Sequence, residues 1–194
     1  RKTLDVVAET GGYEIEYTEG LIGGAAIDAY GTSLRDEEIA AARDADAVML
    51  GAVGGPKWEG VAPEIRPEAG LLRIRAALGL FANLRPIRVF DALVDASPLK
   101  AEVVRGVDML IVRELTGGLY FGKPSEQRVT PEGREAVDTL IYREAEIVRL
   151  VELGYALAAG RRHKVTSVDK ANVMASSRLW REITNEIAAR NPEI

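Results

Sequence analysis

Three arginines lie in segments whose patterns place them near the ends of buried elements. Arg75 lies in a helix-like segment, Arg85 in a strand-like run, and Arg113 directly follows an apolar stretch. Ligands of open α/β sheets gather beyond the carboxyl ends of strands, and an arginine fork matches a carboxylate with two hydrogen bonds. Together these residues suit a small di- or tricarboxylate. The alternative is three ordinary solvated arginines.

Two further side chains suit proton transfer. Lys170 follows a strand-like segment, a position from which a lysine can act as an acid–base group, although pairing with Asp169 at the surface is the alternative. Tyr142 either donates a proton from its phenol or packs its ring in the core. His163 stands among basic residues and is expected at the surface.

Composition excludes several classes of function. The 194 residues carry 25 Lys and Arg against 30 Asp and Glu, a net charge of −5, which disfavours nucleic acid and anionic membranes as partners. The absence of cysteine excludes disulfides, Cys-ligated zinc and iron–sulfur clusters, and a single histidine excludes multi-His metal sites. No apolar run has the length of a membrane span, and a cytoplasmic location is expected.

The elements that must position these residues alternate between helix and strand. Helical spacing marks residues 1–9, 33–45, 67–80, 97–107, 143–159 and a last segment from Ser176 or Ser177. Strand patterns mark residues 13–17, 47–53, 81–90, 108–114 and 164–169. This alternation predicts an α/β fold with a largely parallel sheet.

Two loops stand out from the alternation. The glycine-rich run 51–55 follows a predicted strand but lacks the GxGxxG spacing of a dinucleotide motif, so alone it is most simply a tight turn. Residues 116–139 form a long excursion from the compact pattern, and such excursions are often functional or bind partners.

Five segments in order resemble the 3-isopropylmalate dehydrogenases, a branch of the isocitrate/isopropylmalate dehydrogenase family of β-decarboxylating dehydrogenases. They are Gly51-Ala-Val-Gly-Gly-Pro-Lys-Trp58, Arg66-Pro-Glu-Ala-Gly-Leu-Leu72, Leu80-Phe-Ala-Asn-Leu-Arg-Pro86, Asp108-Met-Leu-Ile-Val-Arg-Glu-Leu-Thr-Gly-Gly-Leu-Tyr-Phe-Gly122 and Ser167-Val-Asp-Lys-Ala-Asn-Val173. The resemblance implies oxidative decarboxylation of 3-isopropylmalate to 4-methyl-2-oxopentanoate with NAD reduction and Mg or Mn, in leucine biosynthesis. A related substrate (tartrate or malate, isocitrate, homoisocitrate) is the alternative.

The same resemblance implies roles for individual residues. The malate-like carboxylates would be held by Arg75, Arg85 and Arg113, and the isopropyl group would contact Leu71 and Leu72. Lys170, reaching the site of a partner subunit, would take the 2-hydroxyl proton, and Tyr142 would protonate the enolate after loss of CO2. The residues expected along the cofactor are Gly55, Pro56, Lys57, Trp58, Glu68 and Asn172.

The resemblance also implies an organisation in two parts. Residues 1–80 would be part of a first, cofactor-side domain, and residues 81–194 most of a second domain for substrate and dimerisation. The excursion 116–139 would be an intersubunit arm, with residues 119–121 in contact with a second copy of a homodimer. The metal-binding aspartates and the adenosine segment would lie beyond Ile194, and a glycine-rich loop before Arg1, so both ends are expected to be truncated.

The 194-residue chain assayed by itself is expected to give no detectable NAD reduction with 3-isopropylmalate and Mg or Mn, because the expected metal ligands lie outside it. Absorbance at the NADH band measures this directly. Measurable turnover by the purified chain would contradict the expectation. The alternative, a non-catalytic module that binds carboxylates or dimerises, predicts the same absence of NAD reduction.

Overall fold

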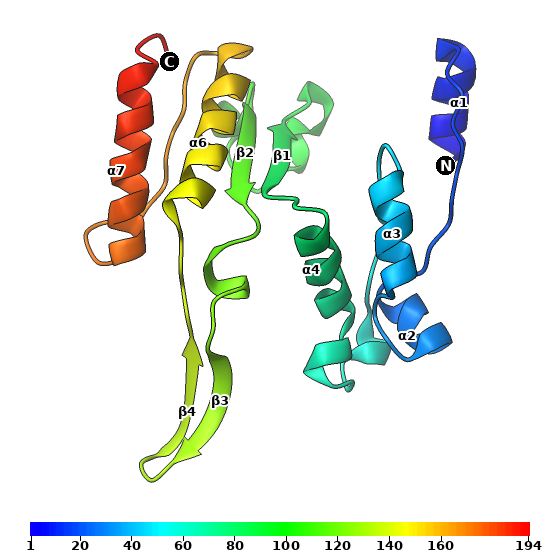
Figure 1. The fold of residues 1–194 in the computed structure, drawn as a ribbon. Helices are drawn as coiled ribbons and strands as arrows, with labels where there is room; N and C mark the ends of the chain where they lie inside the picture. Colours follow the sequence, from blue (N-terminus) through cyan, green and yellow to red (C-terminus); the bar gives the residue numbers. More distant parts are fainter. The chain divides into compact units, whose positions relative to one another are not determined.

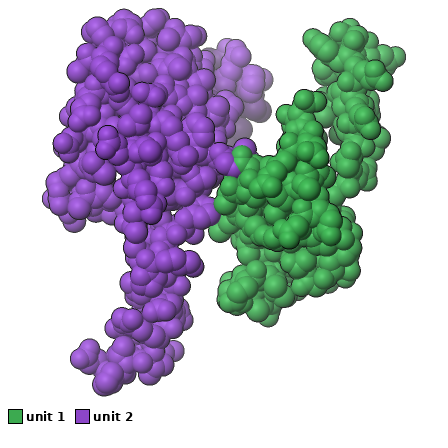
Figure 2. All heavy atoms as spheres, viewed as in Figure 1, with its two compact units in different colours: residues 1–78 green, residues 79–194 purple.

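A computed structural model describes all of residues 1–194, and the chain divides into two compact units, Arg1–Leu78 and Gly79–Ile194 (Figure 2). The division falls two residues before the boundary that the sequence predicts. The cofactor and substrate roles assigned to the two parts remain predictions. Each unit is described by itself.

The first unit is helical. Its helices are α1 (Lys2–Gly11), α2 (Gly24–Tyr30), α3 (Asp36–Asp44) and α4 (Pro67–Ala77), and the connection from α3 to α4 contains the short 3-10 turns Pro56–Trp58 and Pro63–Ile65 (Figure 1). Pro67 opens α4 as predicted, since a proline at the first turn has no amide hydrogen to satisfy. Leu34, Ile39 and Ile74 form the core.

One face of α4 packs inward against the core of the first unit. Pro67, Gly70 and Ile74 are buried, whereas Leu71 and Leu72 are half-buried and Leu80 is exposed. A Cβ on Gly70 would lie 2.6 Å from the carbonyl oxygen of Ser33, so close helix–loop packing selects this face. Leu71 and Leu72 therefore keep surface that a ligand can contact.

Two predicted strands of the first unit are absent. Residues 13–17 and 47–53 are neither helix nor strand, and the side chains of Val48, Met49 and Leu50 are exposed. A strand requires a partner for its backbone hydrogen bonds. Neither segment finds one among residues 1–194.

The second unit contains two antiparallel strand pairs and two long helices. Strands β1 (Ala82–Arg88) and β2 (Asp108–Glu114) pair antiparallel, as do β3 (Ser125–Thr130) and β4 (Gly133–Asp138). Helices α6 (Glu144–Ala159) and α7 (Ala175–Arg190) pack together, and α6 also packs on β2 (Figure 1). Their shared core is Ile147, Val151, Tyr155, Ile183 and Ile187.

Several predictions for the second unit need correction. Both two-stranded sheets are antiparallel, whereas a largely parallel sheet was predicted, and residues 164–169 form no strand. The helix predicted over 97–107 is only the short α5 (Ala101–Val104). The excursion 116–139 does leave the compact pattern, because β3 and β4 form a hairpin that projects away from α6 and α7 (Figure 1). Its role as an intersubunit arm stays a prediction.

No helix in the structure combines the length and apolar character needed to cross a membrane.

Ile187→Ala should lower the free energy of unfolding by about 2 to 5 kcal/mol, since it leaves a cavity in a packed core. The side chain of Ile187 is 1% exposed between α6 and α7. Urea denaturation followed by circular dichroism measures the loss. Val103→Ala on α5, whose side chain is 60% exposed, is the control and should change stability by less than about 0.5 kcal/mol. Equal losses in both variants would contradict the described core.

Candidate functional site

The register of β1 and β2 brings two of the predicted arginines to one face. Asn83 lies opposite Arg113 and Arg85 lies opposite Ile111, so Arg85 and Arg113 are diagonal neighbours on the same side of the pair. Both are exposed, and Arg85 donates from Nε to Asn83 Oδ1 at 2.7 Å. Neither arginine forms a salt bridge, which leaves their guanidinium groups available to an anion.

A tyrosine that the sequence analysis assigned to dimer contacts lies beside Arg113. The guanidinium carbon of Arg113 is 5.4 Å from the ring centre of Tyr120, and Tyr120 is 63% exposed. Tyr120 thus lies beside Arg113 with much of its surface accessible. The signal that sequence reasoning missed is the short spacing between an arginine that ends a strand and a tyrosine in the turn that follows.

Tyr142, the predicted proton donor, has different surroundings. Its ring meets Trp180 edge-on with centroids 5.4 Å apart and packs against the α6–α7 core. Burial, reinforced by the negative charge of Glu114, raises the pKa of the Tyr142 phenol above its ordinary value, and Arg113 opposes this in part. Tyr142 is therefore half-buried, with its ring packed against the α6–α7 core.

Lys170 is exposed in the turn that precedes α7. Its carbonyl accepts from the amides of Val173 and Met174, which fixes the turn. Asp169 pairs with Arg181 through two hydrogen bonds of 2.7 and 2.9 Å rather than with Lys170, and this pairing holds the pKa of Asp169 below its usual range. The surface pair suggested as the alternative for Lys170 does not form.

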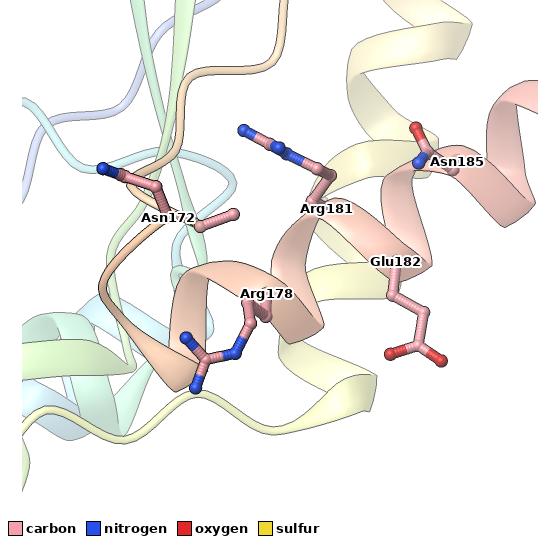
Figure 3. Close-up of a pocket in the computed structure, with 6 residues that line it drawn as sticks. Asn172, Arg178, Arg181, Glu182 and Asn185 are labelled. Atoms are coloured by element: carbon pink, nitrogen blue, oxygen red, sulfur yellow. The ribbon is translucent and has the colours of Figure 1, made fainter.

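Asn172, from the same turn, lines an open pocket of about 490 Å³ (Figure 3). Its other lining residues come from the turn and from α7: Ala171, Arg178, Arg181, Glu182 and Asn185. Asn172 is exposed, so its amide is free to meet a ligand.

In the first unit, α4 presents Arg75 and two leucines from one segment. Arg75 has no hydrogen-bond partner, whereas Arg73 is held by the carbonyl of Leu34 and by Asp36. The two arginines therefore have different roles, since Arg73 secures α4 to the start of α3 and Arg75 is available to a ligand. Leu71 and Leu72 are half-buried beside it in the sequence.

The predicted cofactor loop, residues 55–58, is held by hydrogen bonds to Asp28, a residue that was not among the predicted site residues. Asp28 on α2 accepts a hydrogen bond from Lys57 Nζ at 2.6 Å and one from Trp58 Nε1 at 3.1 Å. These bonds, led by the one from Lys57, lower the pKa of Asp28. A Cβ on Gly24 would lie 2.5 Å from the ring of Trp58, so the indole rests directly on the start of α2.

The loop also lies against the start of α4. A Cβ on Gly54 would lie 3.2 Å from Pro67 Cβ and 3.6 Å from Glu68 Oε1. Gly55, Pro56 and Glu68 are all exposed, and the Glu68 carboxylate lies next to the loop at Gly54. No group of three or more His, Cys, Asp or Glu side chains in the chain is arranged to hold a metal ion.

The structure thus gathers the predicted site residues in three sets, one of which is Lys170 and Asn172 in the turn before α7. Arg85, Arg113 and Tyr142 lie together in the second unit, with Tyr120 added to them. The first unit carries the α4 residues and the loop: Leu71, Leu72, Arg75, Gly55, Pro56, Lys57, Trp58 and Glu68.

The chain is similar to curated proteins along its whole length. It is 57% identical over 192 residues to a 3-isopropylmalate dehydrogenase of Bacillus subtilis, covering 98% of the chain and 53% of that relative. It is 54% identical over 193 residues to a 3-isopropylmalate dehydrogenase of Anaeromyxobacter dehalogenans, covering 100% of the chain and 55% of that relative. The chain spans about half the length of the curated relatives it matches.

Solved structures show the same fold. Isocitrate dehydrogenase from Methylococcus capsulatus superposes with a TM-score of 0.77 at 27% identity, over 100% of this chain and 54% of the other. A β-decarboxylating dehydrogenase from Thermococcus kodakarensis superposes with a TM-score of 0.67 at 29% identity, over 98% of this chain and 50% of the other. The family described as isocitrate/isopropylmalate dehydrogenase matches residues 1–194 throughout. The chain belongs to the isocitrate/isopropylmalate dehydrogenase family, which confirms the predicted resemblance and α/β fold class.

Proposed function

We propose that the whole protein oxidatively decarboxylates 3-isopropylmalate to 4-methyl-2-oxopentanoate with reduction of NAD, a step of leucine biosynthesis in the cytoplasm. The observation that carries the proposal is the pair of exposed guanidinium groups of Arg85 and Arg113, neither in a salt bridge, on one face of β1 and β2. The names and identity of the relatives favour the isopropylmalate branch over isocitrate, homoisocitrate or tartrate.

Substrate recognition follows from charge and apolar surface. The two carboxylates of the malate skeleton accept paired hydrogen bonds from the guanidinium groups of Arg85, Arg113 and Arg75. Leu71 and Leu72 contact the isopropyl group, where their half-buried side chains leave apolar surface to cover. An additional carboxylate, as in isocitrate, would meet these leucines without a hydrogen-bond partner.

Two proton transfers flank the loss of CO2. Lys170 removes the proton of the 2-hydroxyl group as the hydride leaves the same carbon. The resulting 3-carboxy ketone loses CO2, and the electron pair of the broken bond forms an enolate. A tyrosine then protonates that enolate, which gives the product ketone.

We assign that last proton to Tyr120 and not to Tyr142, the residue that the sequence analysis named. An acid for this step must touch the substrate, and Tyr120 is exposed beside Arg113. Tyr142 packs against Trp180 and serves to support this region.

NAD, when bound, supplies the hydride acceptor. Gly55, Pro56, Lys57 and Trp58, with Glu68, would lie along it, and Asn172 would reach its nicotinamide end. A divalent cation, Mg or Mn, is expected from the family, but residues 1–194 supply no ligand cluster for it, so no step is derived through the metal. The hairpin β3–β4 would form the intersubunit arm of a homodimer.

Lys170→Met in the whole protein should reduce kcat by about 100-fold or more with 3-isopropylmalate, because the variant loses the acceptor of the hydroxyl proton. Steady-state NADH formation measures this. Lys164→Met, an exposed lysine of the same segment, is the matched control and should keep the wild-type rate. Isocitrate and tartrate run in parallel identify the substrate: preferred turnover of either would contradict the proposed specificity.

Tyr120→Phe should lower kcat by about 100-fold with little change in KM, since only the acid is removed. Tyr142→Phe should stay within about tenfold of wild type, because its ring still packs on Trp180. The two variants differ from wild type by the same single oxygen, so each is the control of the other. The reverse order of effects would return the proton donor to Tyr142.

A further inference from the structure

A buried carboxylate lies directly after Arg113 and has no part in the proposed chemistry. The side chain of Glu114 is 2% exposed. Because successive residues of a strand point to opposite faces, Glu114 is directed away from the face that carries Arg113.

Every donor around this carboxylate belongs to the turn that follows β2 or to α6. Glu114 Oε2 accepts from the backbone amides of Thr116 at 2.9 Å and Gly117 at 2.6 Å. Glu114 Oε1 accepts from the Thr116 hydroxyl at 2.9 Å and from Arg149 Nη2 at 3.1 Å. The side chain of Glu114 thereby bends the chain back on itself within three residues.

Arg149 on α6 ties this turn to the rest of the unit. It also donates to the Thr116 hydroxyl, and its guanidinium carbon lies 4.9 Å from the ring centre of Phe81. The amide of Leu115 donates to the carbonyl of Phe81 at 2.8 Å. Helix α6, the residue before β1 and the turn are therefore linked through a single arginine.

The turn at residues 115–118 is tightly packed and leaves no room for larger side chains at its two glycines. A Cβ on Gly117 would lie 3.0 Å from Glu146 Oε2 and 3.3 Å from Glu114 Oε2, and Gly118 takes a φ of +77° that disfavours any side chain. The amide of Gly118 donates to the carbonyl of Ile141 at 2.9 Å. The path from Arg113 to Tyr120 runs entirely through this fixed segment.

We propose that Glu114 and Arg149 are positioning residues that set where Tyr120 lies relative to Arg113. They touch neither substrate nor cofactor and act through the turn at residues 115–118. The inference rests on the proposed function, because it gives Arg113 the substrate carboxylate and Tyr120 the proton. A displacement of about 1 Å between two such groups is enough to slow a reaction about 100-fold.

The test uses three variants of the whole protein that break the same contact from different sides. Glu114→Gln keeps an oxygen for the amides of Thr116 and Gly117 but presents an NH2 group toward Arg149. Arg149→Met removes the guanidinium, and Arg149→Lys keeps its charge without its fork. Arg190→Met is the matched control, since Arg190 reaches the exposed Glu152 of α6 from α7 at 3.7 Å.

Glu114→Gln and Arg149→Met should each lower kcat about tenfold or more with KM for 3-isopropylmalate within about threefold. The double variant should lose scarcely more than either single one, because both act through one contact. Arg149→Lys should recover part of the loss, and Arg190→Met should match wild type. Wild-type kcat in folded Glu114→Gln and Arg149→Met, or losses that multiply in the double variant, would overturn the inference.

Amide hydrogen exchange over residues 115–122 measures how firmly the turn is held and does not depend on turnover. Exchange there should rise in Glu114→Gln and Arg149→Met and stay unchanged in Arg190→Met. If the wild-type protein fails to oxidise 3-isopropylmalate, the proposed function is wrong. Unchanged exchange in both Glu114→Gln and Arg149→Met overturns the positioning role whatever the activity.

Discussion

The interaction on which this region depends is the buried carboxylate of Glu114. A carboxylate removed from water is costly unless its oxygens are hydrogen-bonded, and here four donors meet it from Thr116, Gly117 and Arg149. Those donors fix the turn after β2. Since Arg113 points to the opposite face, one strand end combines a structural anchor on its inner side with an exposed arginine on its outer side.

The two units contribute different kinds of surface. The second unit offers charge, with Arg85 and Arg113 set diagonally by the β1–β2 register. The first unit offers a half-buried apolar strip on α4 beside an unpaired Arg75, and a loop that Asp28 clamps through Lys57 and Trp58. A branched dicarboxylate and a dinucleotide need these same surface types, which is why the proposed substrate and cofactor agree with both units.

The sequence predicted those elements that are determined by residues close together in the chain. Pro67 marks the start of α4, and apolar residues at helical spacing mark α6 and α7. Residues 47–53 have the pattern of a buried strand but find no pairing partner in the chain, and the alternation of elements suggested parallel strands where β1 and β2 are antiparallel. The arginines were recognisable by position, whereas the parts played by Glu114 and Asp28 depend on contacts with residues far away in the sequence, Arg149 for Glu114 and Lys57 and Trp58 for Asp28.

The most direct measurement is a crystal structure of the whole protein with 3-isopropylmalate bound. We expect the guanidinium groups of Arg85 and Arg113 to hold the substrate carboxylates, with the Tyr120 oxygen within hydrogen-bond reach of the ligand and Tyr142 still packed on Trp180. Substrate bound away from the β1–β2 arginine face, or touched by Tyr142 while Tyr120 points away, would contradict the proposed site.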